Sequence, residues 1–295
     1  MADITADATG RATSGSPMRA AMARALRRHP MMIAGGVVLV LIAVVSAAAP
    51  LLAPHDPIEL NVVDRLRPPG DDYVLGTDAY GRDMLSRLLY GGRVSLAVGL
   101  AVAALSTLIG LVIGVVAGYY RLADAIIMRV MDGLMAIPGI LLAIALMALT
   151  RASVGVVILA ITVPEIPRVV RLVRAVVLSI REQTYVQAAV AIGTRFPRLM
   201  RRHILPNTVA PLVVQATYIF AQAVLIEAYL SFLGVGTPPE IPSWGNIIAE
   251  GRIYVQIAYW QVLFPGIAIA LMVLSINVLG DGLRDILDPR LARRI

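Results

Sequence analysis

The sequence contains no cysteine and no lysine, and its only histidines are His29, His55 and His203. Without cysteine, the chain has no disulfide, thiolate nucleophile, iron–sulfur cluster or cysteine-based zinc site. A phosphate-binding loop of the GxxxxGK[ST] type needs a lysine beside the β- and γ-phosphates, so this chain is not a P-loop ATPase. The histidines form no HExxH pair, and no GxSxG elbow occurs. We therefore expect no catalytic residue, no metal site and no cofactor in this chain.

Charge is also scarce, since charged residues make up 15% of the chain, against about 25% in ordinary soluble domains. Hydrophobic residues make up 58%, which is more apolar surface than one soluble core can bury. A transmembrane helix needs about 20 mostly apolar residues. Six runs meet this need: Met31–Ala53, Val94–Tyr120, Ala123–Thr150, Val154–Val177, Val209–Val235 and Trp260–Leu279. The predicted fold class is an all-α membrane protein with six transmembrane helices.

All 26 basic residues are arginines, and their distribution predicts the orientation in the lipid bilayer. With the N-terminus inside, the inner segments hold 19 arginines and the outer segments hold 7. The inner segments are 1–30, 121–130, 168–208 and 281–295, and the outer ones are 54–93, 151–153 and 236–259. We therefore predict an N-in, C-in topology. The net charge of +7 follows from the same bias and indicates no nucleic-acid partner.

The predicted organisation has a cytoplasmic N-terminal tail (1–30, disordered over its first 18 residues), a first transmembrane helix (31–53), an extracytoplasmic loop (54–93), a five-helix core (94–280) and a cytoplasmic C-terminal tail (281–295). Ser46–Ala49 resembles a signal-peptide cleavage site, but the long preceding segment and the length of the run favour an uncleaved helix. In the loop, Thr77–Leu89 is predicted to form an amphipathic surface helix or to contact another subunit. The acid-rich stretch Asp56–Asp72 is predicted to be a solvated connector and not a calcium site, since it has no EF-hand spacing.

The inner loop 181–206 contains the strongest candidate for a functional site. Gln183–Ile192 is predicted to form a helix that ends at Gly193, because glycine suits the left-handed C′ position. A second short helix, Arg195–Ile204, is predicted to stop at Pro206. The candidate contact residues, which are apolar, small or at the helix ends, are Tyr185, Val186, Gln187, Ala188, Ala189, Gly193, Leu205 and Pro206. These residue types fit both an interfacial helix whose arginines meet lipid headgroups and a docking site for a cytoplasmic partner.

Four ionisable residues lie within or at the edge of the predicted spans, where each must face protein or water. Arg129 and Asp132 are three residues apart on one helix and are predicted to pair. Glu165 lies in Pro164–Pro167, which is predicted to be a broken helix of the type that lines a cavity. Glu165 and Glu227 are candidates for lining a substrate pathway and meeting a cationic group. Interhelical hydrogen bonding is the alternative role for both carboxylates.

Several motifs in series carry a family resemblance. Gln187-Ala188-Ala189, then Gly193 after three residues, then Leu205-Pro206, resembles the EAA loop of bacterial ABC-importer permeases. Two positions depart from that motif, since Gln187 replaces its acidic residue and His203 stands at its isoleucine position. Further blocks within Leu75–Leu96, Leu230–Gly234, Pro242–Asn246 and Leu279–Arg290 are similar to the C-type permeases of the dipeptide/oligopeptide/nickel group.

The resemblance implies the type I ABC importer permease fold, with 94–280 as the transmembrane core, in a bacterial inner membrane. It implies a B-type permease paralogue, two cytoplasmic ATPase subunits and an extracytoplasmic solute-binding protein as partners. Loop 181–206 would transmit the movement of the ATPases, and the cargo would be peptides or similar small solutes. The competing classes are a self-sufficient secondary transporter or channel, which often has inverted repeats, and an intramembrane enzyme. The sequence shows neither such repeats nor the catalytic groups of an intramembrane enzyme.

Overall fold

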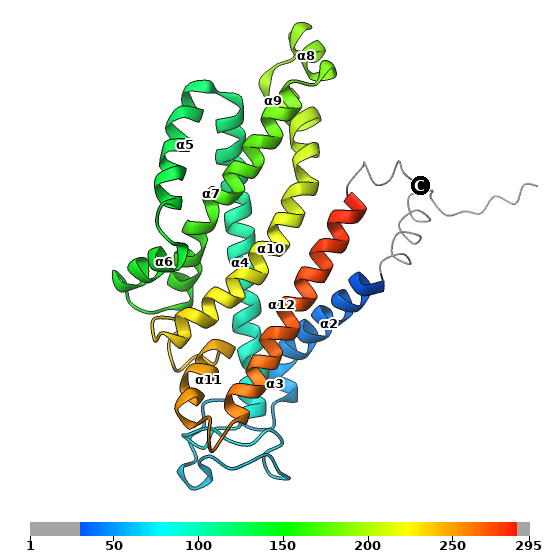
Figure 1. Cartoon of the computed structure of the whole chain (residues 1–295). Helices are drawn as coiled ribbons and strands as arrows, with labels where there is room; N and C mark the ends of the chain where they lie inside the picture. Colours follow the sequence, from blue (N-terminus) through cyan, green and yellow to red (C-terminus); the bar gives the residue numbers. More distant parts are fainter. Residues whose placement is uncertain (1–29, 288–295) are drawn as a thin grey trace, which may run out of the picture.

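The computed structural model describes residues 30–287, and every regular element in this range is helical (Figure 1). The longer helices are α2 (Pro30–Ala47), α4 (Met84–Tyr119), α5 (Arg121–Met135), α6 (Gly139–Ala148), α7 (Val154–Arg181), α10 (Leu205–Phe232) and α12 (Trp260–Leu287). The short elements are α3 (Ala49–Leu52), η1 (Val62–Asp64), α8 (Thr184–Ala191), α9 (Phe196–Leu199), the π-helical turn η2 (Met200–Ile204), α11 (Trp244–Gly251) and η3 (Arg252–Tyr254). The predicted all-α class is confirmed. The predicted disordered tail and the last eight residues of the C-terminal tail lie outside the described residues.

Length and apolar composition support four membrane-spanning helices among the described residues, namely α2, α4, the run Phe196–Phe232 and α12. The third predicted span is divided into α5 and α6, which are bent by 86° relative to each other and together would give a fifth. The fourth predicted span is α7. This helix has 28 residues, enough to cross about 30 Å of hydrocarbon, but its arginines and Glu165 lower its apolar character.

The outer segment before the second span differs from its prediction. Asp83 caps a helix that begins at Met84, and its carboxylate accepts a hydrogen bond from the Ser86 amide at 2.8 Å. This helix, α4, continues without interruption for 36 residues. The predicted separate surface helix over Thr77–Leu89 is therefore wrong. The helix continues through Gly91 and Gly92 because their bare backbone packs directly against Trp244.

The predicted break in α7 is also wrong, because the helix runs continuously through both prolines. Each proline removes one backbone hydrogen-bond donor, a loss that neighbouring groups can satisfy in membrane helices. Glu165 is consequently held on a regular helix, and it is only 3% exposed.

A seam of glycines joins α4 to α7. Gly110, Gly114 and Gly118 repeat at every fourth residue of α4, and they face a valine seam on α7 with the same spacing, formed by Val169, Val173 and Val177. A Cβ atom added to Gly114 would lie 2.7 Å from the Val173 Cβ and 2.9 Å from the Val170 carbonyl oxygen. Small residues allow such close helix contact in membranes, where apolar burial from water does not drive association.

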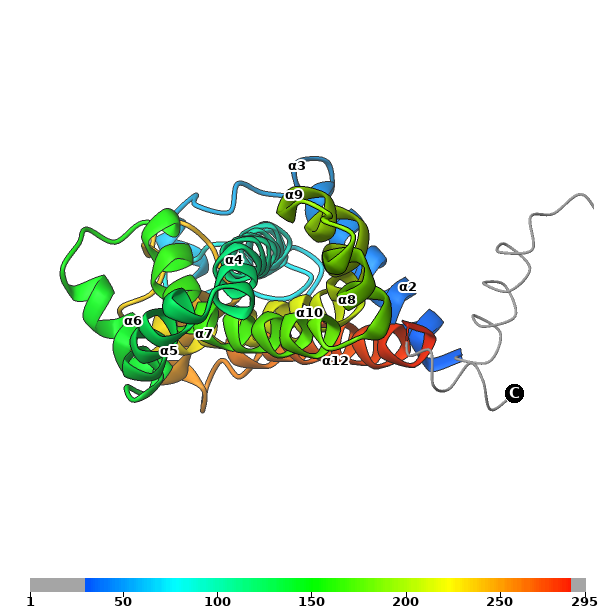
Figure 2. The same ribbon diagram turned by 90° about the horizontal axis from the view of Figure 1, so that it is seen from above.

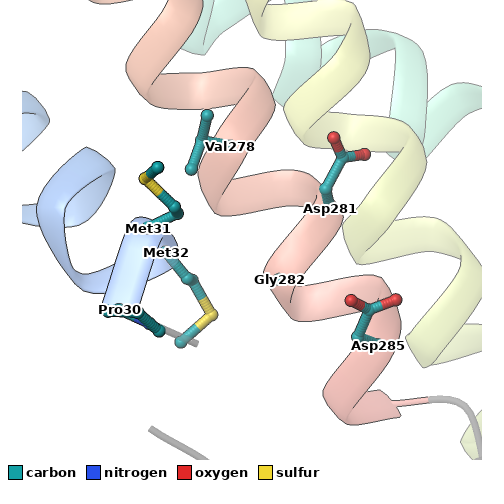
Figure 3. Close-up of a pocket in the computed structure, with 7 residues that line it drawn as sticks. All are labelled: Pro30, Met31, Met32, Val278, Asp281, Gly282 and Asp285. Carbon is teal, nitrogen blue, oxygen red and sulfur yellow. The ribbon is translucent and has the colours of Figure 1, made fainter. Parts of the chain in front are cut away.

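The first helix packs beside the last one (Figure 1). A Cβ atom at Gly35 would lie 2.9 Å from the Ser275 carbonyl oxygen, and Gly282 leaves room for the Met32 side chain. Figure 3 shows Met31 and Met32 of α2 beside Val278 and Gly282 of α12, at the edge of a pocket of about 340 Å³. The close contact fixes α2 against the rest of the bundle.

The two ends of the molecule are built differently. Helix α8 projects at one end, and the loop between α3 and α4 lies with α11 at the other end (Figure 1). Seen along the long axis, α4 lies between α5 and α6 on one side and α2 on the other (Figure 2). The loop 181–206 and the loop 53–83 therefore lie at opposite ends, as the predicted topology requires.

Candidate functional site

The helix at the tip of loop 181–206 is α8, and it ends as predicted at Gly193. Gly193 has a φ angle of +78°. Its amide donates to the Val190 carbonyl at 2.9 Å, and the Thr194 amide donates to the Ala189 carbonyl at 3.0 Å. This pair of hydrogen bonds is the Schellman motif, which needs a residue in the left-handed conformation at C′. The glycine thus sets the direction in which the chain leaves α8.

The candidate contact residues of α8 divide between two faces. Val186 and Ala189 are buried and pack in the core of this chain, so their side chains are not available to another subunit. Tyr185, Gln187 and Ala188 are exposed. The Tyr185 ring also lies 5.8 Å, centroid to centroid, from the ring of His203. The outer face of α8 is therefore small and partly apolar, and its inner face anchors it.

The second half of the loop differs from the prediction. Only Phe196–Leu199 forms an α-helical turn, and the π-helical turn η2 then leads directly into α10. Pro206 is exposed and lies in the first turn of α10, where a missing N–H is tolerated, so it does not stop the chain. Leu205 is half-buried beside it. The loop is thus continuous with the following long helix.

The two candidate pathway carboxylates face the interior of the chain. Glu165 pairs with Arg168, with a distance of 3.0 Å between Oε1 and Nη1. Glu227 is fully buried, and its Oε1 accepts hydrogen bonds from the hydroxyls of Ser231 at 2.9 Å and Ser243 at 2.8 Å. Neither carboxylate lines an open surface of this structure. Glu227 instead ties the end of α10 to the segment that precedes α11.

The predicted pair of Arg129 with Asp132 is not the one that forms. The Asp132 carboxylate pairs with Arg171 of α7, with 2.6 Å between Oδ1 and Nη2. Asp124 pairs in the same way with Arg174. The three-residue spacing within α5 did allow a local pair, but the arginines of α7 lie alongside α5 and compete for both carboxylates. These pairs hold α5 against α7.

A polar stripe along α10 was missed by the sequence analysis. It is formed by Gln215, Tyr218, Gln222 and Tyr229, which lie within a sector of about 60° at 3.6 residues per turn. Tyr218 is 48% exposed and Tyr229 is 54% exposed. None of the four side chains makes a hydrogen bond to another residue within 30–287. The spacing i, i+3, i+7, i+14 is the signal that would have revealed the stripe.

The stripe lies on an open side of the chain. Gln215 lines a groove of about 670 Å³ between α7, α10 and the end of α12, together with Asn207 and Arg284. Glu227 is about 150° away from the centre of the stripe around the helix axis. Since an unpaired amide or phenol is costly against lipid tails, the stripe must face protein or water when the chain is in a membrane.

The outer end is held by a buried ion cluster of two arginines and two carboxylates. Arg82 and Arg87 each pair with both Asp78 and Glu250, at N–O distances between 2.5 and 2.9 Å. Arg87 is 1% exposed. Burial raises the pKa of Glu250, Arg82 opposes this shift and the Asp78 charge adds to it, and the resulting pKa is about 7. The cluster fastens the loop before α4 to α11, which is a structural role for this part of the outer segment.

A family model described as the binding-protein-dependent transport system inner membrane component matches residues 94–293. The chain belongs to this family. A second model, the N-terminal TM domain of oligopeptide transport permease C, matches residues 16–69. The chain is thus a multi-pass permease of the bacterial inner membrane, and the resemblance to the C-type group is confirmed.

Curated relatives cover nearly the whole permease. A probable peptide ABC transporter permease protein y4tQ of Sinorhizobium fredii is 51% identical over 95% of this chain and 97% of the relative. The di/tripeptide transport system permease protein DppC of Pseudomonas aeruginosa is 43% identical over 87% and 88%. A chain from inward-facing conformations of the MetNI methionine ABC transporter has a TM-score of 0.56 and 23% identity, over 70% of this chain and 98% of that chain. That likeness confirms the type I importer fold.

Proposed function

We propose that this permease forms one half of the translocation pathway for peptides in an ATP-driven importer, and that cytoplasmic ATPase subunits move it through loop 181–206. The polar stripe of α10 carries the proposal. Amide and phenol groups form hydrogen bonds with peptide N–H and C=O groups whatever the side chains of the cargo. The names of the relatives, which refer to peptides and dipeptides, support the same class of solute.

The partners in this proposal are those that the family resemblance implies. Because the sequence has no P-loop lysine, ATP would be hydrolysed by separate subunits, of which the resemblance implies two, at the inner end. A B-type permease paralogue would cover the open side of α10 and supply the other half of the pathway. An extracytoplasmic solute-binding protein would deliver cargo at the end formed by loop 53–83 and α11.

The stripe can be tested by thiol accessibility, because the chain has no cysteine of its own. In the importer assembled in vesicles, the thiol of Gln215→Cys is expected to react with a membrane-impermeant methanethiosulfonate about tenfold faster than that of Val213→Cys, since only a thiolate in contact with water reacts. Val213 is 38% exposed and lies on the opposite side of α10 at nearly the same depth. Equal rates at the two positions would contradict a water-filled pathway along the stripe.

The coupling role is tested at Gly193. A valine there would be forced to a positive φ, at a cost of about 1–2 kcal/mol, although a Cβ atom would meet nothing within 4 Å. Gly193→Val is expected to insert normally but to lose ATP-dependent uptake of a labelled dipeptide, whereas Gly193→Asn keeps it because asparagine tolerates this conformation.

A matched control for this test lies at the other end of the molecule. Gly234 has a φ of +80° and equally open surroundings. The Gly234→Val substitution therefore imposes the same backbone strain without altering α8. Normal uptake by Gly193→Val, or an equal loss in both valine variants, would remove the loop from the mechanism.

A further inference from the structure

Three aromatic rings meet where the loop containing α8 and α9 touches the inner end of α4. Phe196, the first residue of α9, lies with its ring centroid 4.5 Å from that of Tyr119 and 5.6 Å from that of Tyr120. Tyr119 is the last residue of α4, and Tyr120 lies between α4 and α5. The Tyr119 and Phe196 rings are inclined at 64°, an edge-to-face arrangement that is favourable for aromatic pairs.

Arg181, the last residue of α7, holds the same corner. Its Nη1 donates to the carbonyl oxygens of Gly118 and Tyr119, both at 3.0 Å. Its Cζ atom also lies 5.4 Å from the centre of the Tyr119 ring. The last carbonyls of a helix have no intrahelical partner, so this guanidinium completes α4 at the point where Phe196 packs. Arg181 thereby contacts both the end of the α4 backbone and the Tyr119 ring that packs against Phe196.

The loop has two covalent connections to the bundle, one from α7 into α8 and one from α9 through η2 into α10. The contact of Phe196 with the corner between α4 and α5 is a third connection, made between side chains. Below that corner, the glycine seam holds α4 tightly to α7. Without the ring contact, a displacement of α8 and α9 would pass along the chain into α10 and α7, and it would reach the α4–α5 corner indirectly, through α7 and the hydrogen bonds of Arg181.

We propose that Phe196 is a positioning residue for transport, which makes the α4–α5 corner move together with α8 when the ATPases close. The proposal rests on the proposed function and extends it to a second part of the bundle, besides α10, that loop 181–206 would move. Arg181 keeps the corner in register by binding the two carbonyls of α4. Loss of the Phe196 ring leaves ATPase docking on α8 intact, because the ring is not part of the exposed face of α8.

The distance between α8 and the corner provides the test. Spin labels on Leu122→Cys, at the start of α5, and Ile192→Cys, just after α8, replace side chains that are 86% and 84% exposed. In the complete importer, the distance between the labels is expected to stay constant between the nucleotide-free and vanadate-trapped states. In the Phe196→Ala background it is expected to change by more than about 2 Å, the scale of helix shifts in such transitions. Phe196→Tyr should restore the constant distance.

Two further measurements separate the possible outcomes. Phe196→Ala and Arg181→Met are expected to copurify with the ATPase subunits in normal yield and to hydrolyse ATP, but to lose most uptake per ATP hydrolysed. Phe232→Ala removes a similar ring beside an arginine, Arg252, at the outer end, and should leave the label distance unchanged. A constant distance in Phe196→Ala, or a changing one in the wild type, would overturn the proposal. A wild-type chain that binds no ATPase would overturn the proposed function as well.

Discussion

Replacing Gly114 with leucine is expected to prevent the permease from accumulating in a folded form. The added Cβ alone would lie 2.7 Å from the Val173 Cβ and 2.9 Å from a backbone oxygen, neither of which can move aside without separating α4 from α7. Overpacking a core costs about 1–3 kcal/mol, and more when backbone must shift. We expect the detergent-solubilised protein to give no monodisperse peak in size-exclusion chromatography.

The control for this substitution is Gly266→Leu in α12. A Cβ atom at Gly266 would meet nothing within 4 Å, so the same change in helix propensity occurs without a clash. Gly266→Leu is expected to fold as the wild type does. A second comparison, Gly114→Leu with Val173→Gly, is expected to recover part of the folded yield because it removes the Val173 Cβ, one of the two closest atoms that the added Cβ would meet. A normal yield of Gly114→Leu alone would show that the seam is not tightly packed.

The second large effect is expected at the outer ion cluster, on replacing Arg87 with leucine. This change leaves Asp78 and Glu250 to share Arg82, so one buried carboxylate either stays uncompensated or must take up a proton, and both outcomes are unfavourable relative to the intact cluster. Breaking a buried ion pair by removing one partner costs about 3–5 kcal/mol. The free energy of unfolding, measured by denaturant titration in detergent, is expected to fall by that amount.

Two further variants test whether the lost stability comes from the unpaired buried charge. Adding Glu250→Gln to Arg87→Leu removes the uncompensated charge and is expected to recover part of the lost stability. Arg67→Leu breaks ion pairs of the same kind on the same loop, but the Arg67 side chain is 48% exposed, and pairs between exposed groups contribute about 0–1 kcal/mol. An equally small effect of Arg87→Leu would mean that the cluster contributes little to holding α11 against the outer loop.

Much of the fold was predictable because membrane helices need long apolar runs, and those runs are visible in the sequence. The helix at α8 and its end at Gly193 were predicted from local rules alone, since a Schellman motif depends on one residue. The boundaries of α4 were not, because Gly91 and Gly92 suggest a break unless their distant neighbour Trp244 is known.

The site was predicted less completely, because its contacts join residues that are distant in the sequence. Glu165 and Glu227 drew attention because carboxylates are rare in apolar runs, yet the partners that bury them, such as Arg168 and Ser243, are known only from the structure. The stripe of α10 consists of uncharged residues and stands out only when its helical spacing is counted. Asp132 was assigned the nearest arginine in sequence, whereas Arg171 from another helix is nearer in space.

The continuity of α9, η2 and α10 has a mechanical consequence. Phe196–Phe232 forms one helical run of 37 residues, which at 1.5 Å per residue is a lever arm about 55 Å long. A tilt of about 5° at its inner end would displace its outer end by about 5 Å. A small tilt of this helical run at its inner end would thus give a larger displacement, and an opening, at its outer end. No part of the helix would need to unwind.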